Sequence, residues 1–80
     1  MPRSKVVTHS DVPALAGAGW LGHTWVCTQI HDGRETMGLQ SCDGPSCAKY
    51  VDEMGDRAGR IFKRTKKGWQ EVSRSAASIA

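Results

Sequence analysis

Two cysteines near the middle of the chain are the residues whose type and spacing best suit chemistry. Cys42 and Cys47 are expected at the end of one strand and in the first turn of a helix, where the positive end of the helix favours a thiolate. Thiolate and imidazole are the usual ligands of zinc, so His23, expected opposite Cys42, is the third candidate ligand of a structural zinc site. Candidates for a fourth ligand are His9, Asp43 and Asp11.

The same cysteines have two other interpretations. Cys27 and Cys47 are small enough to be core residues, and Cys42 would then be a free thiol near the surface. A thiolate beside His23 also has the outline of a nucleophile and a base, but nothing in the sequence supplies an orienting group, an oxyanion site or a cleft. The paired C-x2-C spacing of standard zinc modules is absent. We therefore expect no enzyme and keep structural zinc as a hypothesis.

Positive charge is concentrated in the last third of the chain. Residues 57–74 contain seven lysines and arginines against Glu71 alone, whereas residues 32–56 contain six acidic residues against two basic ones. Lysine and arginine neutralise phosphates, and an exposed tryptophan stacks on bases. The candidate residues for binding nucleic acid or another partner are Arg60, Lys63, Arg64, Lys66, Lys67 and Trp69. The structural alternatives are core packing for Trp69 and a solvated turn for the lysines.

The element that must position His23 and Cys42 is a β-hairpin over about residues 23–41. Asp32-Gly33 stands between two strand-like runs, and Asp-Gly suits a type I′ turn because both central residues need positive φ. With His31 and Arg34 as the flanking pair, Thr28 should face Met37 and Val26 should face Leu39. In this register His23 lies opposite Cys42.

A helix over about residues 46–58 should follow. Asp43 can cap it, Pro45 can open it, and Gly59 suits its end. Apolar residues recur after that cap at spacings of three and four, as an amphipathic helix requires: Cys47, Tyr50, Val51, Met54 and Ala58.

A second hairpin over about residues 60–73 should carry the basic run, with Lys66-Lys67-Gly68 as a three-residue loop. Phe62 then faces Val72 and Thr65 faces Trp69. The alternative is that the helix continues through Ile61 and Phe62. We favour the hairpin, and thus an α+β fold of ββαββ order with the helix packed on a small antiparallel sheet.

The chain should form one small domain over residues 10–74, preceded by a flexible basic arm over residues 1–9 and followed by a frayed tail over residues 75–80. Leu15 and Trp20 should cover an edge of the core. No stretch is long and apolar enough to span a membrane, and three cysteines, an odd number, argue against a disulfide framework, so a cytoplasmic location is expected. A core this small gains stability from a partner, a metal or homo-oligomerisation.

These features favour a small non-enzymatic binding module. Its basic C-terminal hairpin would contact the phosphate backbone of nucleic acid. The alternative is a small inhibitor or adaptor that docks its basic face on the acidic patch of a larger protein, such as a nucleic-acid-processing complex.

Overall fold

Asp32 and Gly33 form the tight turn that their sequence predicts. Their φ angles are 50° and 75°, both positive, as a type I′ turn requires. In the computed structural model, which describes residues 6–80, this turn joins β2 (Trp25–His31) to β3 (Arg34–Ser41). The first predicted hairpin is therefore confirmed.

The register of this hairpin is as predicted near the turn and wrong further away. Thr28 faces Met37, but a bulge then shifts the pairing by one residue, so that Cys27 faces Leu39 instead of Gly38. The helix that follows explains the bulge, because a Cβ on Gly38 would lie 2.7 Å from the ring of Tyr50. Gly38 leaves room for this ring at the point where β3 bends.

The main helix, α1 (Gly44–Met54), begins where its caps predict and ends earlier. The Asp43 carboxylate accepts a hydrogen bond from the backbone N–H of Ser46 at 2.7 Å, and Pro45 lies in the first turn. Gly55 terminates the helix with a φ of 55°, and a 3₁₀ turn, η3 (Gly55–Arg57), follows. The predicted end at Gly59 is wrong.

Residues 58–72 form the second predicted hairpin, made of β4 (Ala58–Thr65) and β5 (Gly68–Val72), and not a continuation of the helix. Its register is one residue off the prediction. Thr65 pairs with Gly68 across a two-residue turn, and Arg64 pairs with Trp69. Because neighbouring strand residues point to opposite faces, this single step moves Trp69 to the face of Phe62.

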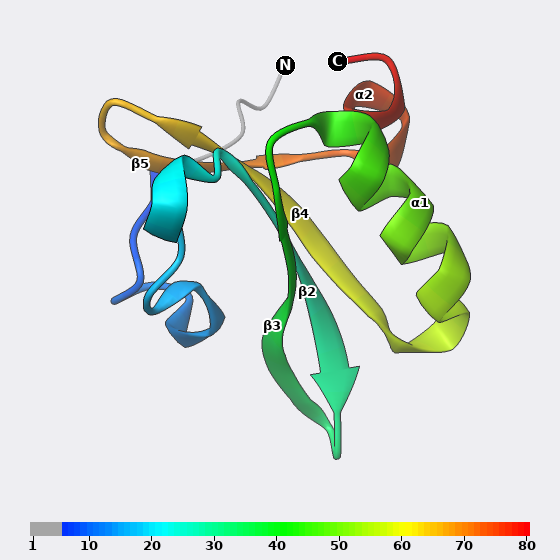
Figure 1. Ribbon diagram of the computed structural model, residues 1–80. Helices are drawn as coiled ribbons and strands as arrows, with labels where there is room; N and C mark the ends of the chain where they lie inside the picture. The colour runs from blue at the N-terminus through cyan, green and yellow to red at the C-terminus, as the bar shows by residue number, and fades with distance from the viewer. Residues whose placement is uncertain (1–5) are drawn as a thin grey trace, which may run out of the picture.

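The predicted α+β class, with one main helix on an antiparallel sheet, is confirmed, but the ββαββ order leaves out two elements. Within residues 6–80 the sheet has five antiparallel strands in the order β1-β5-β4-β2-β3 (Figure 1). The extra strand, β1 (Val6–Val7), pairs with β5, so this part of the expected flexible arm belongs to the sheet. Residues 1–5 of the expected arm lie outside the described residues. Residues expected to fray instead form α2 (Arg74–Ser78), in which Ala77 is buried.

Each face of the sheet carries its own core. Helices α1 and α2 cover one face, and the segment before β2, with the 3₁₀ turns η1 (Pro13–Leu15) and η2 (Trp20–Gly22), covers the other (Figure 1). The helix-side core contains Trp25, Cys27, Cys47, Ala48, Ile61 and Ala77. The opposite core contains Val12, Leu15, Val26, Phe62 and Trp69. No helix among residues 6–80 is long and apolar enough to cross a membrane.

Candidate functional site

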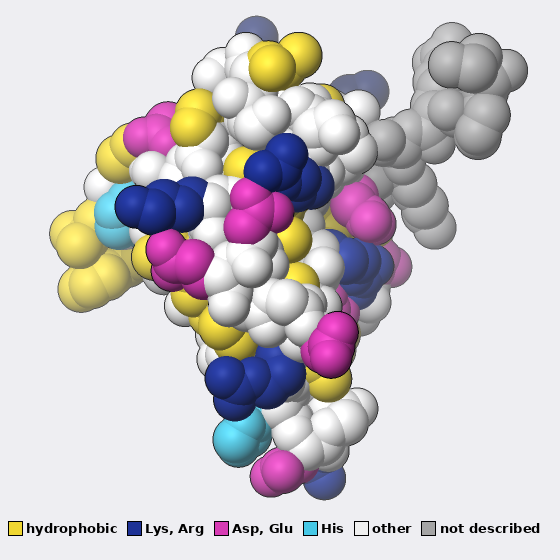
Figure 2. All heavy atoms as spheres, turned by 90° about the vertical axis from the view of Figure 1, so that its right-hand side faces the viewer, with side chains coloured by type: hydrophobic (Ala, Val, Ile, Leu, Met, Phe, Trp, Pro, Cys, Tyr) yellow, Lys and Arg dark blue, Asp and Glu magenta, His cyan; other side chains and the backbone are white. Residues whose placement is uncertain are grey.

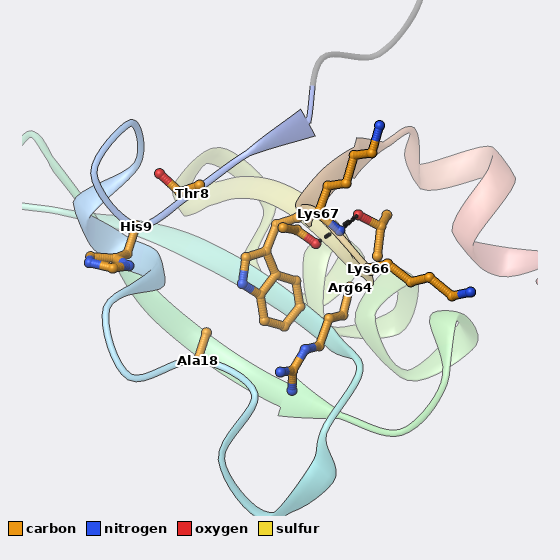
Figure 3. A pocket seen from close by; sticks show the side chains of 9 residues that line it. Thr8, His9, Ala18, Arg64, Lys66 and Lys67 are labelled. Atoms are coloured by element: carbon orange, nitrogen blue, oxygen red, sulfur yellow. Dashed lines mark hydrogen bonds between the residues drawn. The ribbon is translucent and has the colours of Figure 1, made fainter.

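A groove of about 300 Å³ lies where the β4–β5 turn meets the segment that follows β1 (Figure 3). The turn contributes residues 64–69, and the segment contributes Thr8, His9 and Ala18. Three of the lining side chains are cationic, Arg64, Lys66 and Lys67, and none is acidic. The fold thus brings four of the six predicted interaction residues, these three cations and Trp69, to one groove.

Side-chain hydrogen bonds hold the backbone of this turn. The hydroxyl of Thr65 donates to the carbonyl oxygen of Gly68 at 3.0 Å and accepts from the backbone N–H of Lys67 at 3.2 Å. Lys66 and Lys67 extend from the turn in different directions (Figure 3). Both side chains are exposed, so their ammonium groups can contact an anion in solution without any change in the fold.

Arg64 links the turn to the N-terminal segment. Its guanidinium points toward the loop that follows Ala18 (Figure 3), and Nη1 donates to the carbonyl oxygen of Gly19 at 3.5 Å. A Cβ on Gly19 would lie 2.8 Å from that nitrogen, and its φ is 87°, so glycine suits this position for both space and backbone conformation. The backbone N–H of Gly19 in turn donates to Oε1 of Gln40 at 2.9 Å.

Trp69 lines the groove but is a core residue. It is 7% exposed and packs with Phe62 and Val26 on the face that the N-terminal segment covers. Its ring is therefore not available for the base stacking that the sequence suggested. Core packing, the structural alternative for Trp69, describes its position.

Arg60 does not line the groove and instead forms ion pairs with two carboxylates. Its Nε donates to Oε2 of Glu35 at 2.8 Å, its Nη2 donates to Oε1 of the same carboxylate, and Nη1 lies 3.6 Å from Glu71. These hydrogen bonds lower the pKa of Glu35 and raise the pKa of Arg60. The structure thus separates Arg60 from the cations of the turn.

Lys63 lies on the other face of the sheet. Its ammonium group is 5.7 Å from the centroid of the Trp25 ring, a cation–π distance, whereas Arg64, the next residue, points to the opposite face. The six predicted interaction residues therefore do not form one surface.

The predicted zinc ligands are not gathered. Cys47 is fully buried in the core that contains Cys27, whereas Cys42 is exposed. A hydrogen bond to Cys27 and burial both raise the pKa of the Cys47 thiol. The bulge in the first hairpin removes the register that placed His23 opposite Cys42. Among residues 6–80 no three His, Cys, Asp or Glu side chains lie close enough together to hold a metal ion. The zinc site stays a prediction that this geometry does not support.

The prediction that Trp20 covers an edge of the core is wrong. Leu15 is buried as predicted, but Trp20 and Leu21 are 70% and 74% exposed. Leu21 adopts φ 59° and ψ 22°, a left-handed conformation that costs a branched residue roughly 1–2 kcal/mol. The glycines on both sides of this pair were the available signal, because they permit the tight turn that directs both side chains outward.

Comparison of the chain with family models, curated proteins and solved structures found no match.

Proposed function

We propose that the protein is a non-enzymatic binding module that holds the phosphate backbone of nucleic acid at the β4–β5 turn. The observation that carries this proposal is that Arg64, Lys66 and Lys67 line one groove and that no acidic side chain is among its lining residues. Arg64 near the end of β4 and Lys66 and Lys67 in the turn that follows can contact successive phosphates.

The surroundings of the other cations support this choice of site. Arg60 is paired with Glu35, and Arg74 is paired with Asp52. On the side of the molecule that carries α1, basic and acidic side chains are interspersed (Figure 2). Such a mixed surface is weakly attractive to a polyanion, because its own carboxylates already neutralise much of its charge.

Salt-dependent binding of a fluorescent oligonucleotide tests the proposal. Affinity should fall linearly on a log–log plot against salt, with a slope of about −0.7 per phosphate contact on a single strand and about −0.9 on a duplex. The double variant Lys66→Ala/Lys67→Ala should weaken all sequences alike and flatten the slope by about two contacts.

The matched control is Lys49→Ala/Arg57→Ala, which removes the same charge from exposed positions outside the groove. Equal effects of the two double variants would show that only net charge matters and would refute a localised site. Recovery from native lysate of a nuclease-resistant protein partner, lost with Lys66→Ala/Lys67→Ala, would replace the proposal with the inhibitor or adaptor alternative.

A further inference from the structure

Trp20 and Leu21 form an exposed apolar pair on a loop of defined shape. The loop is closed by two backbone hydrogen bonds, from the N–H of Gly22 to the oxygen of Gly19 at 3.2 Å and from the N–H of His23 to the oxygen of Trp20 at 3.3 Å. Leu21 is held in its unfavourable left-handed conformation within this loop. The two side chains are therefore presented by a fixed backbone.

This pair lies beside the cationic groove. Gly19, the residue before Trp20, accepts a hydrogen bond from the guanidinium of Arg64, and Ala18 lines the groove itself. Trp20 therefore directly follows the residue that contacts Arg64, one of the three cations proposed to bind phosphate. The loop and the turn come from distant parts of the sequence and meet only in the folded chain.

We infer that Trp20 is a stacking platform for an unpaired base and that the nucleic acid bound at the groove is single-stranded. This inference rests on the proposed phosphate-binding function. An aromatic ring next to cations that track the backbone is the arrangement by which proteins bind single strands without sequence preference. Inside a duplex the faces of the bases are already stacked on one another, so an exposed ring gains little there.

Of the three tryptophans, Trp20 is the one suited to this role. Trp25 and Trp69 are 6% and 7% exposed and belong to the two cores, whereas Trp20 is 70% exposed. Leu21, 74% exposed, adds apolar surface next to the ring. Trp20 belongs to neither core, and the residue after it, Leu21, adopts a strained backbone conformation, which is why we assign Trp20 to a ligand.

The test measures binding of labelled oligothymidylate of about 16 nucleotides, the upper site size of known single-strand modules, against a duplex of equal length. Single strands should bind more tightly. Trp20→Ala should weaken single-strand binding by about 5-fold to 150-fold, the range seen when one stacked aromatic residue is removed. Its salt slope should stay that of the wild type because no charge is lost, and Trp20→Phe should retain most of the affinity.

Ile79→Ala is the matched control, since Ile79 is 86% exposed and follows α2, on the other side of the sheet. It should bind like the wild type. Tryptophan emission gives a second readout: a bound single strand should quench the wild type, and Trp20→Phe should abolish that quenching. Thermal unfolding of Trp20→Ala should be close to that of the wild type, because the side chain is outside the cores.

The possible outcomes distinguish stacking on Trp20 from phosphate binding at the β4–β5 turn. If Trp20→Ala binds like the wild type while Lys66→Ala/Lys67→Ala does not, phosphate binding stands and stacking is refuted. Stacking is equally refuted if duplex binds as tightly as single strand, or if Trp20→Phe is as weak as Trp20→Ala. If the wild type binds neither nucleic acid, the proposed function fails and the inference fails with it.

Discussion

The hydroxyl of Thr28 has a structural role that one substitution can isolate. Thr28 is fully buried; its Oγ1 donates to Oε2 of Glu35 at 2.7 Å and accepts from the backbone N–H of Arg60 at 2.7 Å. The pairing of β2 with β4 is irregular here, with a register shift between Cys27 and Gln29. The hydroxyl thus supplies the Arg60 N–H with an acceptor where the ladder is interrupted.

Thr28→Val keeps the shape of the side chain and removes both hydrogen bonds. A hydrogen bond to a charged group contributes about 1.5–3 kcal/mol, and a buried N–H left without an acceptor costs about 1–3 kcal/mol. Because Arg60 and Glu35 are partly exposed, water relieves part of this loss. We expect the free energy of unfolding to fall by about 2–4 kcal/mol, a large share of the total for a domain of this size.

Denaturant unfolding followed by tryptophan fluorescence measures this change as a lower midpoint at an unchanged m-value. The control is Thr36→Val, the same substitution on the neighbouring strand at a half-buried side chain that forms no hydrogen bond within the described chain. A Thr28→Val protein within about 0.5 kcal/mol of the wild type would refute the reasoning, since surface changes of no structural consequence fall in that range.

Three further predictions concern pH, the helix start and the cysteines. Because the folded state lowers the pKa of Glu35 below its usual value of 4.5, its contribution to stability is present above that pH and lost as the pH falls through the lowered pKa; Glu35→Gln should flatten the acid limb of a stability–pH curve. Asp43→Ala removes the cap of α1 and should lower the free energy of unfolding by about 1 kcal/mol in denaturant titrations, whereas an unchanged midpoint would contradict the capping role. A thiol reagent should label one cysteine rapidly in the folded protein, the exposed Cys42, and mass mapping of a second fast site would contradict the burial of the other two.

Local chemistry made several elements predictable from the sequence. Asp32-Gly33 specifies its turn through the backbone conformations that these residues tolerate, and Asp43 and Pro45 specify where α1 begins. The short strand β1 carried no such signal, because two residues pair with β5 only once the sheet exists. The register of both hairpins was partly or wholly wrong for a similar reason. Gly38 bulges to fit Tyr50, and Gly68 lies in the ladder, where a Cβ would come within 2.5 Å of the Val7 carbonyl oxygen.

Sequence and tertiary structure also determined different features of the candidate site. The sequence by itself determined that positive charge is concentrated near residues 60–67, and it offered Trp69 as the aromatic partner. Only the tertiary structure decided which of these residues line the groove. A single register step turned Trp69 into the core, while the glycine-rich loop that contacts Arg64 left Trp20 outside.

Long-range contacts decided which cations remain available. Glu35 is 25 residues from Arg60 in sequence, and it reaches the guanidinium because β2 lies between their strands and Thr28 bridges them. No charge count along the chain predicts such a pair. Turns and caps depend on neighbouring residues, so a sequence determines them; burial and ion pairing depend on which strands lie side by side, so only the fold determines those.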